Sequence, residues 1–187
     1  MTPPPGDILP LDFAGRPAAE VARALLGQRL AAWDGRRWRT GRILETEAYL
    51  GPHDRAAHSF KGRTARTEVM FGPPGHAYVF LVYGMHLCVN VVTGAGAAVL
   101  LRALEVDPAL GRADGPGRLT RALGVRLAHS GHPLDPPPLL LLAGEGIPPR
   151  EVVASRRVGI DYAGPGWARR RLRFSLRGHP GVSAPRP

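Results

Sequence analysis

The sequence predicts an α+β fold: one compact domain, residues 1–187, with a curved, mostly antiparallel sheet, short flanking helices and a protruding hairpin. Three observations predict this class. The length of 187 residues fits a single domain with a core of ordinary size. Apolar runs of strand length recur between turns rich in Gly and Pro, and few stretches have helical character. The chain has no internal repeat and no linker that would divide it.

The elements of the first half follow in order. Residues 16–27 predict a helix that Gly and Pro delimit. Residues 28–50 predict two strands that join at Asp34-Gly35, a dipeptide suited to a tight hairpin. A loop rich in Gly, His and Arg follows at 51–66.

The second half begins with another hairpin. Residues 76–92 predict two strands that break near Tyr83-Gly84, and residues 97–106 predict a further buried strand. Residues 117–124 predict a short helix that ends at its glycine.

The prolines between 131 and 150 exclude a long element there and leave one short strand, 139–142. A last pair of strands is expected around 155–160 and 171–178. We expect the termini, 1–15 and 183–187, to be loose.

The charge favours a polyanionic partner. Lys and Arg total 25 against 15 acidic residues, which gives a net charge of +10, and Lys61 is the only lysine. Arginine can donate two hydrogen bonds to one phosphate, so nucleic acid is the favoured partner and an anionic membrane the weaker one. A compositional bias toward Arg, Ala, Gly and Pro is the alternative explanation.

Several classes of protein are excluded. Cys88 is the only cysteine, so neither an intrachain disulfide nor a Cys-rich zinc site can form. No apolar run approaches the roughly 20 residues of a membrane span. The N-terminal segment lacks the features of a secretory signal, so we expect a cytoplasmic protein without a membrane partner.

The stretch "ETEAYLGPHDRAAHS" places two carboxylates and a phenol close together on a predicted strand. Side chains alternate between the faces of a strand. The core face should therefore carry Leu44, Thr46, Ala48 and Leu50, and the other face Ile43, Glu45, Glu47 and Tyr49. The second face suits the wall of a cleft. The alternative is that both glutamates simply pair with nearby arginines.

Several longer strings carry a resemblance to a known family. They are "GRILETEAYLGPHDRAAHS", "MFGPPGHAYVFLVYGMHLCVN", "VLLRALE" and "RVGIDYAGPGWARRRLRF". Together they resemble the alkyladenine (3-methyladenine) DNA glycosylase family, from about residue 16 to 182. The resemblance implies an enzyme that flips a damaged purine out of duplex DNA and hydrolyses its N-glycosidic bond.

The resemblance also implies catalytic roles. Glu47 corresponds to the base that activates water, while Glu45 is left as a supporting residue. Arg102 and the main-chain carbonyl of Val158 correspond to groups that hold this water. For Arg102 the alternatives are a phosphate contact or a salt bridge on the strand. A charged alkylated purine leaves without an acid, so one working carboxylate suffices.

The base pocket follows from the same resemblance. Tyr49 and His58 match positions that contact the flipped base, and Phe80 stands where the family usually has tyrosine. The main-chain amide of His58 matches a donor to the 6-position of the purine. Asn90 matches the residue that crowds the 2-amino group of guanine, with a backbone-bonded strand asparagine as its alternative.

The resemblance also implies a DNA contact at the hairpin of residues 76–92. Tyr83 matches the wedge that enters the minor groove, and Met85 a contact near it. A core tyrosine is the alternative, because Val79 and Leu81 share its strand face.

The remaining expectations concern cofactors and partners. His53, Asp54 and His58 lack an established metal spacing, so we expect neither a metal nor a cofactor. Lys61 lies in a Gly/Arg loop and is expected to contact phosphate, not to form a Schiff base. We expect a monomer that acts on double-stranded DNA with damaged purines and associates with the nucleoid if the source is bacterial. Two rivals are a non-enzymatic nucleic-acid-binding module and a nucleoside hydrolase.

Overall fold

In the part of the chain that the structure describes, eight strands form one antiparallel, open sheet and three short α-helices accompany it, so the predicted α+β class is confirmed. The computed structural model describes residues 1–12 and 15–186. The elements are α1 (Ala18–Ala24), β1 (Arg29–Trp33), β2 (Trp38–Tyr49), β3 (Ala77–Val82), β4 (His86–Gly94), β5 (Ala97–Val106), α2 (Pro116–Leu123), β6 (Leu139–Leu142), β7 (Val152–Ser155), α3 (Pro165–Ala168) and β8 (Arg173–Leu176). No helix within the described ranges combines the length and the apolar character needed to cross a bilayer.

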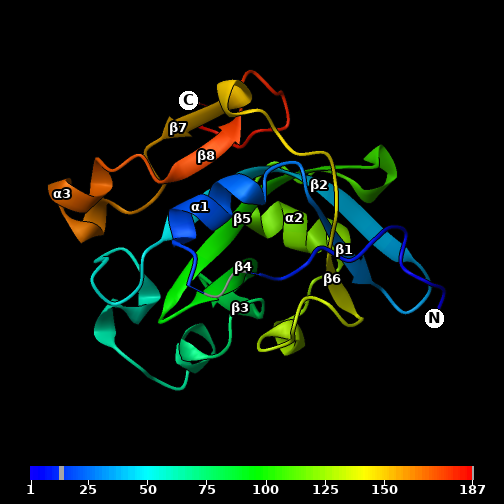
Figure 1. The fold of residues 1–187 in the computed structure, drawn as a ribbon, viewed down its shortest axis with the longest axis horizontal. Helices are drawn as coiled ribbons and strands as arrows, with labels where there is room; N and C mark the ends of the chain where they lie inside the picture. The colour runs from blue at the N-terminus through cyan, green and yellow to red at the C-terminus, as the bar shows by residue number, and fades with distance from the viewer. Residues whose placement is uncertain (13–14, 187) are drawn as a thin grey trace.

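Strand β2 is the centre of the sheet. The main path runs β3-β4-β5-β2-β1-β6, and β8 pairs with both β2 and β7. In Figure 1, β7 and β8 lie together along one side of the molecule, with α3 beyond one end of the pair. Strand β2 therefore contacts three partners, and its residues 45–47 pair with β5 and β8 at once.

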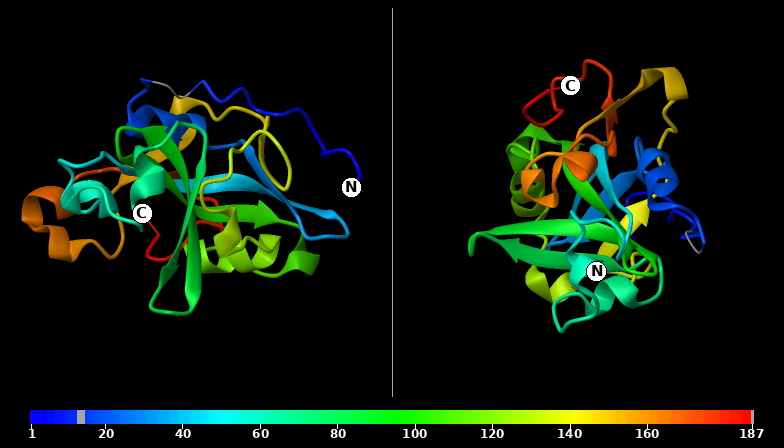
Figure 2. Two further views of the ribbon diagram at one scale, coloured as in Figure 1. Left: turned by 90° about the horizontal axis from the view of Figure 1, so that it is seen from below. Right: turned by 90° about the vertical axis from the view of Figure 1, so that its left-hand side faces the viewer.

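The β3–β4 hairpin forms where the sequence predicts it. Its turn contains Tyr83 with φ 50° and Gly84 with φ 70°, both in the left-handed region. Glycine adopts that region freely, whereas tyrosine does so at a cost. The hairpin projects from the body of the protein in both views of Figure 2. The protruding hairpin expected from the sequence is thus present.

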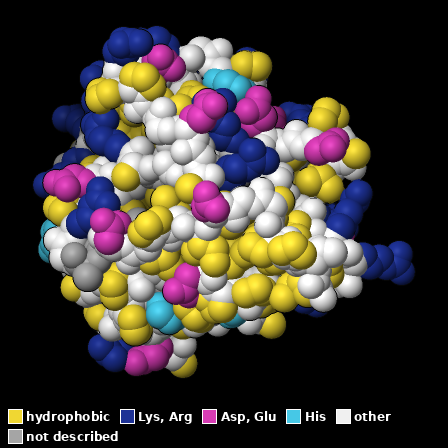
Figure 3. Space-filling view, turned by 45° about the vertical axis from the view of Figure 1, so that its right-hand side comes forward, with side chains coloured by type: hydrophobic (Ala, Val, Ile, Leu, Met, Phe, Trp, Pro, Cys, Tyr) yellow, Lys and Arg dark blue, Asp and Glu magenta, His cyan; other side chains and the backbone are white. Residues whose placement is uncertain are grey.

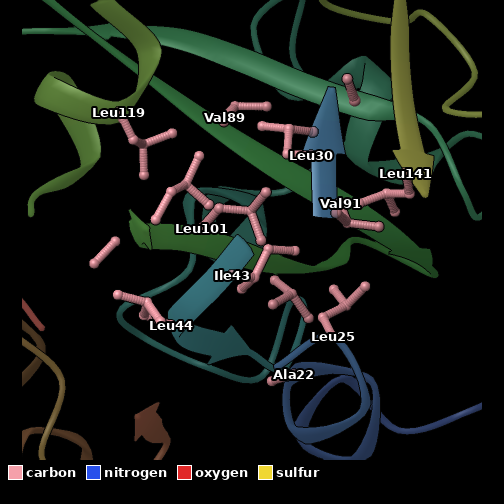
Figure 4. Packing of buried hydrophobic residues seen from close by; sticks show 14 of the residues in the cluster. Ala22, Leu25, Leu30, Ile43, Leu44, Val89, Val91, Leu101, Leu119 and Leu141 are labelled. Atoms are coloured by element: carbon pink, nitrogen blue, oxygen red, sulfur yellow. The ribbon is translucent and has the colours of Figure 1, made fainter. Parts of the chain in front are cut away.

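The hydrophobic core lies between one face of the sheet and helices α1 and α2. Figure 4 shows Leu25, which directly follows α1, and Leu119 of α2 directed toward the strand residues Ile43, Val91 and Leu101. All five side chains are fully buried. Helix α2 ends as predicted, because Gly124 takes a left-handed conformation with φ 74° and closes its last turn.

One predicted face assignment is wrong. Ile43 was expected beside Glu45 and Glu47, but it is packed in the core together with Leu44. The register of β2 against β5 shifts between Ile43 and Glu45. Such a β-bulge adds a residue to one strand and breaks the simple alternation of faces. The bulge lets Ile43 face the core although Glu45 does not.

The expected strand at 155–160 is displaced toward the N-terminus. Strand β7 ends at Ser155, and residues 156–160 form a loop against the C-terminal end of β2. Arg157 is buried there on Asp54, and the Val158 N–H donates to Glu47. These contacts to distant side chains replace the pairing that a longer strand would make.

The ends of the chain are less loose than expected. The N–H of Leu9 donates to the carbonyl of Leu141, and Ile8 forms a β-bridge with Leu142. Ser183 is buried and bonded to Glu45. The expectation of a loose segment therefore fails at these positions, while residues 13–14 and 187 lie outside the described part of the chain.

Candidate active site

A row of paired residues crosses four strands of the sheet. Glu47 of β2 pairs with Leu100 of β5, Leu100 with Asn90 of β4, and Asn90 with Tyr78 of β3. Residues two positions away on the same strand share the face. The face opposite the core thus carries a carboxylate at one end of the row and aromatic rings at the other.

A pocket opens on this face. It is lined by Tyr49, Ala56, His58, Met70, Tyr78, Phe80, Asn90, Ala98, Leu100 and Tyr162. The four residues that the family resemblance assigns to the base pocket, Tyr49, His58, Phe80 and Asn90, all belong to this lining. An apolar, aromatic pocket with a few polar groups is typical of a small-molecule or base-binding site.

Three rings form one wall of the pocket. Phe80 stacks on Tyr78 with ring centroids 5.2 Å apart, and His58 meets the edge of Phe80 at 4.5 Å. The Nδ1 atom of His58 lies 3.0 Å from the hydroxyl oxygen of Tyr78. The sequence reasoning did not assign Tyr78, although its position two residues before Phe80 places it on the same face.

His58 is neutral at physiological pH. Its partial burial, and then the charge of Arg66, lower the pKa of the imidazole to about 4. A neutral imidazole has one donor and one acceptor nitrogen. His58 can therefore hold Tyr78 without placing a positive charge in the pocket.

Asn90 is hydrogen-bonded to the backbone and also lies in the pocket lining. Its side-chain Nδ2 donates to the main-chain carbonyl of Tyr78 at 3.0 Å. Its side chain also lines the pocket. The hydrogen bond to the backbone fixes how the amide faces the pocket.

Glu47 contacts the Tyr49 side chain, which lines the pocket, and Glu47 itself is fully buried. The Tyr49 hydroxyl donates to its Oε2 at 2.9 Å, and the Val158 N–H donates to its Oε1 at 2.8 Å. Arg102 Nη1 lies 3.5 Å from Oε1. Val158 thus contacts the carboxylate through its N–H, and the contact expected between its carbonyl and the catalytic water stays a prediction.

The electrostatic balance at Glu47 favours a stronger base. Burial raises the pKa of its carboxyl group above the usual range, while Arg102, the Val158 N–H and the Tyr49 hydroxyl act in the opposite direction. A group with a raised pKa accepts a proton more readily than an ordinary carboxylate. Such tuning is frequent at catalytic sites and also occurs in structural ion pairs.

Glu45 is bound on all sides by cations and donors. Both Arg102 and Arg173 donate through Nε to its Oε1, the former at 3.0 Å. The Ser183 N–H donates to Oε2 at 2.8 Å. Glu45 is fully buried and does not line the pocket. Arg102 forms the salt bridge to Glu45 and is only 7% exposed, so its guanidinium group is not accessible to a DNA phosphate.

The residues that might have been mistaken for a metal cluster point to different partners. Asp54 is paired with Arg157, His58 contacts Tyr78, and His53 lies near Trp167. Among residues 1–12 and 15–186, no three His, Cys, Asp or Glu side chains gather closely enough to hold a metal ion.

The tip of the β3–β4 hairpin carries exposed apolar side chains. Tyr83 is 90% exposed and Met85 is 70% exposed. The alternative of a core tyrosine is therefore wrong for Tyr83. Two exposed apolar side chains at the tip of a projecting hairpin suit contact with a partner.

Basic side chains lie beside the aromatic pocket. A second hollow shares His58 and Tyr162 with the pocket and is also lined by Arg55, Lys61 and Arg66. On the face shown in Figure 3, by comparison, Lys and Arg are interspersed with Asp and Glu. Cations next to an aromatic pocket suit the phosphates of a nucleic acid whose base enters that pocket.

Comparisons with known proteins agree on one class. The model of the family described as "Methylpurine-DNA glycosylase (MPG)" matches residues 12–180. A protein of Myxococcus xanthus (strain DK1622) is 52% identical over 181 residues, covering 94% of this chain and 93% of the relative. One of Anaeromyxobacter dehalogenans (strain 2CP-1) is 50% identical over 185 residues, covering 96% and 87%. One of Legionella pneumophila (strain Lens) is 43% identical over 179 residues, covering 94% and 97%.

All three relatives bear the name "Putative 3-methyladenine DNA glycosylase". The fold, the pocket and these relatives together define a DNA glycosylase, a hydrolase of DNA repair. The family match spans most of the sequence, and the chain belongs to the methylpurine-DNA glycosylase family. The resemblance inferred from its motifs is thereby confirmed.

Proposed function

We propose that the protein is a monofunctional glycosylase that flips alkylated or deaminated purines out of duplex DNA and hydrolyses the N-glycosidic bond. The observation that carries this proposal is the position of Glu47, a buried carboxylate hydrogen-bonded to Tyr49 at the edge of an aromatic pocket. The substrate class comprises 3-methyladenine, hypoxanthine and ethenoadenine. The protein acts as a monomer in the cytoplasm or on the nucleoid and starts base excision repair without a metal or cofactor.

The chemistry needs one base. Water attacks the C1′ atom of the sugar as its bond to the purine nitrogen breaks, and the bonding electrons leave with the purine. In 3-methyladenine these electrons neutralise the positive charge of the purine, whereas a neutral purine such as hypoxanthine takes a proton from solvent as it leaves. Glu47 takes the proton of the attacking water, and its charge stabilises the developing oxocarbenium ion. Arg102 and Val158 hold the carboxylate and the water. Glu47 must be ionised for this step, so activity is lost as the pH falls through its raised pKa.

The pocket supplies the selection among purines. Tyr49, His58 and Phe80 stack on or contact the flipped base. The main-chain N–H of His58 donates to the 6-position, which accepts hypoxanthine and disfavours the amino group of adenine. Asn90 crowds the 2-amino group of guanine. Phe80 stacks on a base as tyrosine would, but it offers no hydroxyl.

Tyr83 is proposed as the wedge that fills the gap left by the flipped nucleotide. Replacing Tyr83 by alanine should leave the melting temperature nearly unchanged, because the side chain is 90% exposed. Unstacking a base costs a few kcal/mol, which the inserted ring offsets in part. Single-turnover excision should therefore fall most for hypoxanthine paired with T and least for hypoxanthine in a single strand. An equal loss on both substrates would place Tyr83 outside the wedge role.

The proposed function is tested by the products formed from defined oligonucleotides. Duplexes that carry hypoxanthine, ethenoadenine or 3-methyladenine should release the free base and leave an intact abasic strand, while an undamaged duplex should not react. Lys61 is exposed and outside the pocket lining, so borohydride should trap no covalent complex. Efficient trapping that disappears in Lys61→Ala would contradict the monofunctional assignment.

The same panel separates the two rival functions. A non-enzymatic binding module would bind the lesion duplexes without releasing a base. A nucleoside or nucleotide hydrolase would release hypoxanthine from free inosine, tested beside the duplexes, and not from DNA, whereas the net charge of +10 favours a polyanionic substrate.

A further inference from the structure

Asp54 and Arg157 form a buried ion pair beside the candidate active site. Arg157 Nη1 donates to Asp54 Oδ2 at 2.6 Å and Nη2 donates to Oδ1 at 3.0 Å, so the pair is bidentate. Both side chains are fully buried. A bidentate pair fixes the orientation of both groups, which a single contact does not.

The pair is tied to the backbone on both sides. Asp54 accepts from the N–H groups of Leu50 and Ala56, each at 3.0 Å. Arg157 also donates to the carbonyl of Ala48 at 2.9 Å. The pair thus joins the end of β2, the loop that follows β2, and the loop after β7, although its members are 103 residues apart in the sequence.

This pair contacts or adjoins the two groups that donate to Glu47, the proposed general base: the Tyr49 side chain and the Val158 N–H. The guanidinium carbon of Arg157 lies 4.7 Å from the centroid of the Tyr49 ring, a distance typical of a cation–π contact. The next residue, Val158, presents its N–H to Glu47. Tyr49 presents its hydroxyl to the other oxygen of the same carboxylate. A small shift of Arg157 would therefore disturb both donors to Glu47.

We propose that Asp54 and Arg157 are a positioning pair, which holds Tyr49 and the Val158 N–H on the Glu47 carboxylate and so keeps this carboxylate oriented and ionised. Neither residue lines the pocket. The pair acts through its neighbours and not on the substrate. This inference rests on the proposed role of Glu47 as the base.

The direction of the expected effect follows from the groups that face Glu47. They are Glu45 and Tyr49 on β2, Arg102 on β5, Cys88 on β4, Tyr162 and the Val158 N–H, while Arg157 acts on Tyr49 and Tyr162. The Val158 N–H and the Tyr49 hydroxyl both lower the pKa of Glu47, against the effect of burial. Burial raises the pKa of Cys88 to about 11 and that of Tyr162 above its usual range, so these two groups stay neutral near pH 7. Weakening the two donors would raise the pKa of Glu47 further.

The test is a pH profile of single-turnover excision of hypoxanthine for the wild type and Arg157→Lys. Lysine keeps the charge but cannot make the bidentate pair. We expect excision at pH 7 to fall by about tenfold or more, in line with a misplaced catalytic group. We also expect the acid-side midpoint to move upward by about half a pH unit or more, in line with a lost hydrogen bond to the carboxylate. Asp54→Asn should shift the midpoint in the same direction.

Leu140→Ala is the matched control. Leu140 is fully buried in a separate cluster with Ala31 and Leu142, so its truncation destabilises the fold without contact to the site. It should lower the melting temperature and leave the midpoint unmoved. An unmoved midpoint in both pair variants, or failure of both to fold while Leu140→Ala folds, would assign the pair to the fold alone. Absence of base release by the wild type would instead contradict the proposed function.

Discussion

Glu47→Gln should lower single-turnover excision of hypoxanthine from duplex DNA by about 10²-fold or more, the usual cost of losing a positioned general base. Glutamine retains the shape of the side chain: its one carbonyl oxygen can accept from the Val158 N–H, and its amide NH2 can donate to the Tyr49 hydroxyl oxygen, at the two positions where the carboxylate oxygens accept now. It cannot take a proton from water. Affinity for lesion-containing DNA should hold or rise slightly, because one negative charge near the DNA phosphates is lost. Excision is measured with enzyme in excess, and affinity by titration of a labelled duplex.

Glu105→Gln provides the control for this substitution. Glu105 lies on β5, the neighbour of β2, but its side chain is 51% exposed and pairs only with Arg42 and His179 at the surface. Excision by Glu105→Gln should match that of the wild type. Comparable excision by Glu47→Gln and Glu105→Gln would remove Glu47 from the reaction and favour a different source of base release.

Glu45→Gln should act on stability, with an expected loss of about 3–5 kcal/mol in the free energy of unfolding, the usual cost of breaking a buried ion pair by removing one partner. Among the described residues, the substitution removes the carboxylate that pairs with Arg173, which is 2% exposed, and it weakens the hold on Arg102. Urea unfolding followed by circular dichroism measures this quantity through linear extrapolation. Glu47→Gln, measured in the same way, should cost clearly less, because Arg102 keeps Glu45 as its partner.

The two substitutions would then have different effects: Glu45→Gln would lower the free energy of unfolding, and Glu47→Gln would lower the rate of excision. Equal unfolding free energies for Glu45→Gln and the wild type would contradict the structural role of the Glu45 cluster. Excision by Glu45→Gln should be compared at a temperature at which the variant is fully folded, so that loss of fold is not read as loss of chemistry.

Features set by neighbouring residues were accessible from the sequence. The hairpin break at Tyr83-Gly84 and the end of α2 at Gly124 depend on local backbone conformations that glycine permits. The strand at 139–142 also appears where an apolar run is flanked by proline and glycine. In each case the chain within a few residues contains the determining information.

Features set by distant residues were not accessible in the same way. The bulge that turns Ile43 toward the core depends on the pairing of β2 with β5. The early end of β7 depends on Asp54 and Glu47, which lie more than 100 positions before the loop that contacts them. The anchoring of Ser183 requires Glu45, 138 positions away. The periodicity of apolar residues does not report contacts between distant segments. It therefore predicted a regular strand at Ile43 and at 155–160, and a loose end at 183–187.

Some residues of the candidate site were predicted from the sequence, and others became apparent only in the structure. The family resemblance gave Tyr49, His58, Phe80 and Asn90, which the pocket brings together. It did not give the hydrogen bond of Tyr78 to His58, although alternation along β3 places Tyr78 on the same face as Phe80. It gave no role to Arg157, which the sequence analysis placed in an expected strand at 155–160 without a partner.

The contacts around Glu47 and Glu45 join segments made at very different times during synthesis. Strand β2 is complete long before Val158 and Ser183 have been added, yet both supply N–H groups to its carboxylates. Contacts of such high sequence separation form late in folding, because the intervening chain must first be ordered. They also open early when a peripheral segment detaches while the central sheet stays intact. If Glu47 acts as proposed, a molecule in which these contacts have opened would keep the main path of the sheet, β3-β4-β5-β2-β1-β6, and yet be unable to cleave a base from DNA.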